Sequence, residues 1–226
     1  ISAIRSINDD GLLSIVSHSS NRIFDANHGK GSLGLAIAAI HYLRKYPDAI
    51  LVGLDTQLAQ EWLSGREDNQ LPDLIGIRLE EMTVDIVEVK TYRDNDNAFI
   101  IDGDTISGHA VAQSTVLEGL IKEIFGSAER ITTVSRREIL REQVYETLFQ
   151  TEMDSYKKHE RTNQLNALFA GEYKIEVSKQ ICFVDFENGE SSEKTYKGKD
   201  EYAGNDYFQE NTGKYGEAYA RCFKVK

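Results

Sequence analysis

The chain has 226 residues, 40% of them apolar and 28% charged, which excludes a disordered chain and allows one large domain or one domain with an appendage. No apolar run approaches the roughly 20 residues of a membrane span and no secretory signal is visible, so we expect a cytoplasmic protein without membrane contact. The formal net charge of −11 excludes a uniformly basic surface for nucleic acid, and affinity for a polyanion would come from local patches or a partner.

Hydrophobic periodicity and turn residues predict helices and strands that alternate after an irregular entry at 1–32. Helices are expected at 33–46, 56–63, 107–125 and, with interruptions, 135–169, where Ser135 and Glu138 fit a capping box. Strands are expected at 49–55, 72–80, 84–92, 174–186 and, as a short piece, 221–225. This order predicts an α/β fold, a mixed central sheet flanked by helices on both faces, with a core at 33–186 and a polar C-terminal appendage at 187–226.

Two predicted strands are joined by a turn at Glu81–Met82, and three charged side chains gather at the end of this hairpin that is away from the turn. A two-residue loop at this turn would set Asp73 opposite Lys90 and Ile75 opposite Glu88. Because side chains alternate along a strand, Asp73, Glu88 and Lys90 then share one otherwise apolar face, near one end. Charges on such a face are costly to desolvate, so either Lys90 forms a buried ion pair with one acid, or the two carboxylates hold a cation.

The cation interpretation has a specific chemistry. Mg²⁺ binds well to one or two carboxylates together with waters and phosphate oxygens. A nearby ammonium can orient a water and neutralise charge that develops on phosphorus oxygens. The acidic balance of the chain is compatible with such a pocket, since a site for a cation has to be negative.

Pro72–Asp73 followed by Glu88–Val89–Lys90 resembles the signature of the PD-(D/E)xK nuclease superfamily, with Asp73 and Glu88 15 residues apart on adjacent strands. The resemblance covers residues 33–186 and implies a restriction-endonuclease-like core and a metal-dependent deoxyribonuclease. In that family pattern Asp73, Glu88 and the Val89 carbonyl bind Mg²⁺ or Mn²⁺, and Lys90 orients the attacking water.

Gln113 is the one amide in the sheet-facing stripe of the helix at 107–125. It is similar to the Gln that follows the ExK strand in RecB-type nucleases, where it supports the site, although the aromatic residue expected four positions later is Leu117 here. The alternative is a glutamine at the rim of the core, bonded to backbone. The helix at 33–46 lacks the Glu that completes the metal site in several members, and Asp55 is the substitute that the sequence offers.

The segments 73–93 and 107–110 are faintly similar to nuclease domains of bacterial restriction and phage-defence proteins, some of them attached to motor ATPases. This resemblance implies DNA as the substrate and a motor ATPase or another defence-system domain or subunit as the partner. The chain begins with Ile1 rather than Met, and we expect it to be part of a larger protein. The sequence does not indicate an oligomeric state.

Other segments offer nucleic-acid contacts. Gly29–Gly34 matches G-x-G-x-x-G before a helix but lacks the preceding strand of a dinucleotide site. The favoured functional interpretation of this segment is therefore a loop in which His28 and Lys30 contact phosphate. A flexible loop without a ligand is the alternative. A basic cluster at 135–169 is either a solvated helix face or a phosphate contact, with Arg136, Arg137 and Arg141 as its leading candidates.

Three hypotheses therefore stand after the sequence is read. The first is a metal-dependent nuclease, the second a catalytically silent DNA-binding or assembly module of the same fold, and the third a dinucleotide-binding protein. The sequence does not separate the first two. Cys182 and Cys222 have no metal or redox spacing, and we expect no disulfide.

Overall fold

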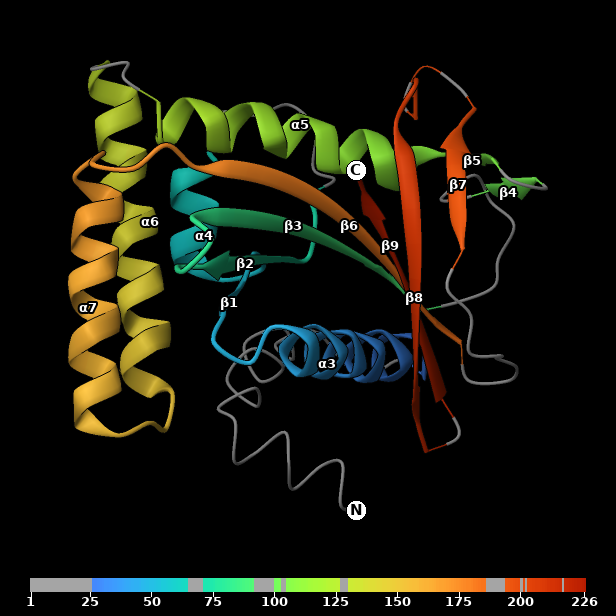
Figure 1. The fold of residues 1–226 in the computed structure, drawn as a ribbon, viewed down its shortest axis with the longest axis horizontal. Coiled ribbons are helices and arrows are strands. Elements are labelled where there is room, and N and C mark those ends of the chain that lie inside the picture. The colour runs from blue at the N-terminus through green and yellow to red at the C-terminus, as the bar shows by residue number, and fades with distance from the viewer. Residues whose placement is uncertain are drawn as a thin grey trace.

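The computed structural model describes residues 26–64, 71–91, 100–102, 105–126, 130–185, 194–199, 201, 203–216 and 218–226 (Figure 1). Its strands form one mixed nine-stranded sheet in the order β1-β2-β3-β6-β9-β8-β7-β5-β4. The strands are β1 (Ile50–Gly53), β2 (Leu74–Arg78), β3 (Thr83–Lys90), β4 (Ile100–Asp102), β5 (Thr105–Ser107), β6 (Glu176–Asp185), β7 (Thr195–Gly198), β8 (Tyr207–Tyr215) and β9 (Ala218–Val225). The helices are α3 (Ala26–Lys45), α4 (Gln57–Trp62), α5 (His109–Ile124), α6 (Ile131–Gln150) and α7 (Ser155–Phe169).

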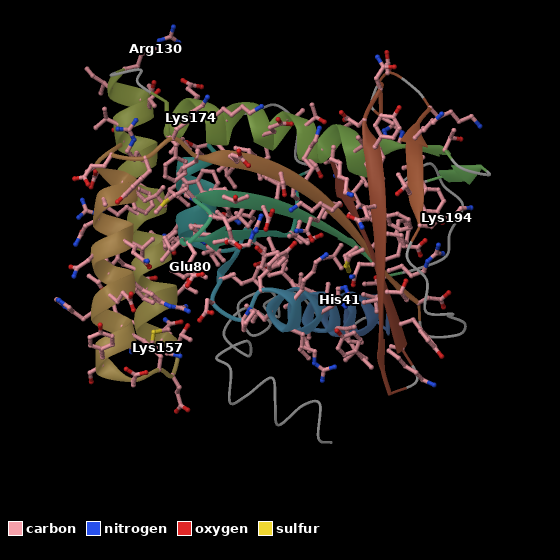
Figure 2. The ribbon with its side chains drawn as sticks, in the orientation of Figure 1. His41, Glu80, Arg130, Lys157, Lys174 and Lys194 are labelled. Carbon is pink, nitrogen blue, oxygen red and sulfur yellow. A yellow bond between two sulfur atoms is a disulfide. The ribbon has the colours of Figure 1, made fainter. Side chains whose placement is uncertain are left out.

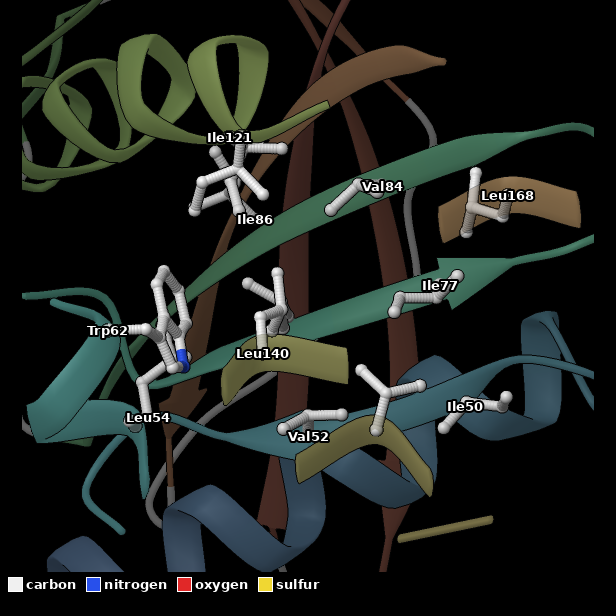
Figure 3. Packing of buried hydrophobic residues seen from close by; sticks show 14 of the residues in the cluster. Ile50, Val52, Leu54, Trp62, Ile77, Val84, Ile86, Ile121, Leu140 and Leu168 are labelled. Atoms are coloured by element: carbon white, nitrogen blue, oxygen red, sulfur yellow. The ribbon is translucent and has the colours of Figure 1, made fainter. Parts of the chain in front are cut away.

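Helices cover both faces of the sheet, as the sequence predicted. On one face, β1, β2 and β3 pack against α4, α5, α6 and α7 around Trp62, Ile86 and Ile121 (Figure 3). On the other face, α3 packs on Leu74 and Val87. Alternate residues of β2 and β3 thus supply two separate cores, which explains why both strands are buried over almost their whole length. Within the described residues, no helix has the length and apolar character to cross a bilayer.

The β2–β3 hairpin has a longer turn than the sequence suggested. Ile75 lies opposite Ile86, so the expected pairing of Ile75 with Glu88 is wrong by two residues. The turn contains residues 79–82, with the Met82 N–H donating to the Leu79 carbonyl and Met82 at a φ of 48°. Because side chains alternate with a period of two, a shift of two residues leaves every side chain on its predicted face.

Two helices begin earlier than expected. Helix α3 starts at Ala26, inside the predicted irregular entry, so the segment Gly29–Gly34 is helical rather than a loop. Helix α6 starts at Ile131, where the flanking Arg130 makes no side-chain capping bond, and the predicted capping box at Ser135 is wrong because that residue lies in the second turn. The first turn of α6 is instead tied to α5, since Thr133 Oγ1 donates to Glu123 at 3.0 Å.

The C-terminal stretch is part of the sheet and not an appendage. Strand β9 pairs with β6 over most of its length, and β8 and then β7 are the next strands in the sheet. Its polar residues satisfy one another, because the buried Glu210 accepts from Arg221 Nε at 2.6 Å and from Tyr196 Oη at 2.8 Å. Opposed residues Cys182 and Cys222 on β6 and β9 form a disulfide, which corrects the expectation of none.

Candidate functional site

The end of β3 brings together the four side chains that the sequence singled out. Glu88 and Lys90 lie on β3, Asp73 immediately precedes β2, and Gln113 lies on α5. The β2–β3 register, continued by one pair beyond Leu74, sets Asp73 beside Glu88. All four therefore lie on the α5 side of the sheet, at the end of β3. Figure 1 shows helix α5 running along that side.

Asp73 is bound to the neighbouring strand rather than to another side chain. Its Oδ2 accepts the Val89 N–H at 2.7 Å, and its carbonyl accepts the Leu54 N–H at 2.9 Å. Burial, opposed by the Val89 hydrogen bond and by Lys90, raises the pKa of Asp73 to about 6. The carboxyl is thus fixed in place and holds its proton more firmly than an exposed aspartate.

Pro72 accounts for the geometry around Val89. The Val89 N–H points toward β2, and in an extended strand the carbonyl of the same residue points the same way. The hairpin register, extended further, sets Pro72 opposite Val89, and proline has no N–H to donate to that carbonyl. The Val89 carbonyl is therefore directed at the Asp73 side of the hairpin without a ladder donor from Pro72.

Glu88 is the least satisfied acid of the site. Its side chain is 2% exposed, Oε1 pairs with the Lys90 ammonium, and the buried Oε2 has no hydrogen-bond partner. Burial, with the Asp73 charge as a second cause, raises the pKa of Glu88 to about 8 despite the neighbouring Lys90. A buried carboxylate oxygen without a donor costs stability, so this arrangement is poor as a purely structural element.

Asp85, on the same strand but the opposite face, shows what a structural acid looks like here. It is fully buried, and Tyr42 Oη and Arg78 Nε each donate to its Oδ2 at 2.7 Å. Ser178 Oγ donates to the other oxygen. Both oxygens of Asp85 have donors, whereas one oxygen of Glu88 has none.

Lys90 lies between the acid and the amide. Its ammonium contacts Glu88 and also donates to Gln113 Oε1 at 3.4 Å. Helix α5 thus places its one sheet-facing amide at the site, where the sequence put it, rather than in a bond to backbone at the core rim. The glutamine can hold the ammonium in position if Glu88 turns to another partner.

The site offers a small set of oxygen ligands. Asp73, Glu88 and the Val89 carbonyl are the groups that fit a hard cation, and the unpartnered Glu88 Oε2 is the observation that favours one. Among the described residues, no group of three or more His, Cys, Asp or Glu side chains could hold a metal. Such a sparse set fits Mg²⁺ or Mn²⁺, because Mg²⁺ usually keeps several waters and takes one or two carboxylates.

Comparison with known proteins adds nothing to this geometry. No protein-family model matches the chain, and neither the curated proteins nor the solved structures gave a significant match.

The predicted phosphate contacts lie elsewhere. Arg137 donates to the carbonyls of Ile124 and Gly126 and so binds the C-terminal end of α5, eleven residues from Gln113 or about 16 Å along the helix. Arg136 donates to the Ser64 carbonyl at 2.8 Å. Arg141 contacts Glu138 and Asn166 on α6 and α7. These arginines join helices to one another and are not brought to the site.

The glycine segment does not form a phosphate loop. His28 and Lys30 lie in the first turns of α3, and their side chains are outside what the structure describes. Gly34 has a packing role, because a Cβ there would lie 1.8 Å from Thr91 Cγ2, just beyond the end of β3. The sequence did not predict this close approach of α3 to the strand that carries Glu88 and Lys90.

Proposed function

We propose that the chain is a metal-dependent nuclease of the PD-(D/E)xK type that hydrolyses phosphodiester bonds of DNA. The observation that carries the proposal is the buried Glu88 Oε2, which has no hydrogen-bond partner and lies beside Asp73 and Lys90. Raised carboxyl pKa values of this kind cluster at functional sites. The proposal includes a role within a larger restriction or phage-defence protein in the cytoplasm, with a motor ATPase or another subunit as its partner.

Each residue has a defined task in the proposed reaction. Asp73, Glu88 and the Val89 carbonyl would hold Mg²⁺ or Mn²⁺, which when bound supplies charge stabilisation at the phosphorus oxygens. Lys90 orients the attacking water and offsets negative charge on the pentavalent phosphorus. Gln113 keeps the Lys90 ammonium in place once the Glu88 carboxylate is engaged elsewhere.

A second candidate has its own support. The direct contact between Lys90 and Glu88 is also what a buried ion pair would make, and such a pair would suit a catalytically silent DNA-binding or assembly module. The third candidate, a dinucleotide-binding protein, loses its basis because Gly29–Gly34 is helical. Activity and metal response separate the first two.

The test is cleavage of supercoiled plasmid and linear duplex DNA in Mg²⁺, Mn²⁺ or EDTA. Wild type is compared with Lys90→Ala and with Lys157→Ala, which removes an exposed ammonium on α7. The proposal expects metal-dependent cuts by wild type and Lys157→Ala and at least a hundredfold slower cutting by Lys90→Ala. No cutting by any of them, and no change in melting temperature with Mn²⁺, would leave the silent module.

A further inference from the structure

A row of side chains crosses the sheet from the candidate site to β8. Lys90 on β3 is in register with Phe183 on β6, Phe183 with Arg221 on β9, and Arg221 with Thr212 on β8. In-register partners share a face, and Phe183 packs on the cluster that α5 joins, so the row lies on the α5 side. Neighbouring strands are about 4.8 Å apart, which puts the Arg221 backbone about 10 Å from that of Lys90.

The aromatic and the cation of this row are held rigidly. The Phe183 ring meets the buried Phe223 ring edge to face, with centroids 6.4 Å apart. The Arg221 guanidinium lies 5.5 Å from the Phe223 centroid, and its Nε donates to the buried Glu210. Phe183 is half-buried and the Arg221 side chain keeps 35% exposure, so both retain surface for a ligand. Groups fixed in this way lose little entropy on binding.

A second row follows toward the β8–β9 turn. Asp185 is opposite Tyr219, and Tyr219 is opposite Lys214. The exposed Lys214 ammonium lies 5.3 Å from the Tyr219 ring centroid. The two rows together alternate cations and aromatic rings, from Lys90 through Phe183 and Arg221 to Tyr219 and Lys214. Asp185 is the one carboxylate at the surface of the second row.

We propose that this surface, formed by Lys90, Phe183, Arg221, Tyr219 and Lys214, binds single-stranded DNA and leads it to the candidate site. The inference rests on the proposed nuclease function and specifies its substrate. Rings on a sheet face stack on unpaired bases, while nearby cations contact the backbone phosphates. A duplex keeps its bases stacked on one another, so a half-buried Phe183 favours the single strand.

Binding of a labelled oligothymidylate tests the proposal by fluorescence anisotropy, in EDTA so that cleavage does not interfere. Phe183→Leu keeps an apolar contact with Phe223 but removes the ring, and we expect at least about fivefold weaker binding. Lys214→Glu is expected to weaken binding and to reduce the slope of log affinity against log salt by roughly 0.7 per lost phosphate contact. Asp185→Asn removes a negative charge from the same surface and is expected to tighten binding.

The control is Lys157→Glu, which makes the same charge change on α7 at the other end of the molecule from β8 (Figure 2). Affinity should stay at the wild-type value in this variant. The proposal is overturned if wild type does not bind the oligonucleotide, if Lys157→Glu weakens binding as much as Lys214→Glu, or if duplex DNA binds with the same sensitivity to Phe183→Leu.

Plasmid cleavage distinguishes this inference from the proposed function. If the variants bind in the predicted order but no protein cuts the plasmid with metal, the binding surface is supported and the nuclease function is contradicted. If wild type cuts the plasmid but binding is unaffected by Phe183→Leu and Lys214→Glu, the nuclease function is supported and the binding surface is contradicted. The folded state of each variant is checked by its melting curve, and Arg221 is left unchanged because it neutralises the buried Glu210.

Discussion

Asp73 Oδ2 accepts the backbone N–H of Val89 at 2.7 Å, so the acid that precedes β2 is bound to the strand that carries Glu88. The position of the Asp73 carboxyl relative to β3 is therefore set by a main-chain hydrogen bond. The two carboxylates repel each other, and the charge of Asp73 contributes to the raised pKa of Glu88. A cation would remove that repulsion, and several consequences can be measured.

The stability of the metal-free protein should fall as pH rises through the titration of Glu88. Its pKa is raised from 4.5 to about 8 on folding, so between these values the unfolded state has released a proton that the folded state retains. The free energy of unfolding then decreases with pH, at most by about 1.4 kcal/mol per pH unit for one proton. Thermal or urea unfolding in EDTA between pH 5 and pH 9 measures it.

Glu88→Gln is the matched variant for this pH dependence. It keeps the size of the side chain and cannot ionise, so its unfolding free energy should change less than that of wild type above pH 7, where Asp73, with a pKa of about 6, is mostly ionised. An equal slope in wild type and variant would assign the pH dependence to other groups.

Metal binding at neutral pH should release a proton. Glu88 with a pKa of about 8 is largely protonated at pH 7, and the cation binds the carboxylate form, so Mn²⁺ has to displace the proton. Calorimetry at pH 7 in buffers of different ionisation enthalpy should give up to about one proton released per Mn²⁺, and fewer at pH 9. Asp73→Asn should weaken binding, whereas Asp48→Asn on the exposed α3–β1 turn should not. Mn²⁺ binding without proton release would contradict the assignment of Glu88 as a ligand.

The site was predictable because it depends on alternation, and the rest was harder because it depends on long-range contacts. Asp73, Glu88 and Lys90 stay on one face whether the turn holds two residues or four, so the error in register did not separate them. The turn itself depends on a positive φ at Met82, and the sequence does not predict it because methionine rarely adopts this conformation.

The C-terminal strands were missed for a different reason. Strand β8 is rich in polar residues, and its buried Glu210 is acceptable only because Arg221 and Tyr196 reach it from neighbouring strands. Those partners are 11 and 14 positions away in sequence, and no local sequence pattern predicts the contacts. The same is true of Arg137 near the start of α6, since its acceptors are the carbonyls of Ile124 and Gly126 at the end of α5.

Gly34→Ala should destabilise the fold near the candidate site. A Cβ at this position would lie 1.8 Å from Thr91 Cγ2, so α3 has to move away from the end of β3. Overpacking of this kind costs typically about 1–3 kcal/mol. Gly31→Ala is the control within the same helix, because its Cβ would meet nothing within 4 Å and alanine is the better helix former by about 1 kcal/mol. Urea unfolding of both variants should thus move in opposite directions, and a shared direction would contradict the packing role of Gly34.

Reduction of the Cys182–Cys222 disulfide should lower the free energy of unfolding and leave the candidate site on the β2–β3 hairpin intact in the folded protein. The bond links residues 40 positions apart, and the chain-entropy model gives about 4 kcal/mol for a loop of that length. It joins β6 to β9 on the α3 side, whereas Glu88 and Lys90 face α5, so Mn²⁺ affinity should change little while the folded state persists. Unfolding curves and Mn²⁺ titrations with and without a reductant, beside a Cys182→Ala/Cys222→Ala variant, measure both effects. An unfolding free energy that reductant leaves unchanged would mean that the two thiols are not joined in solution.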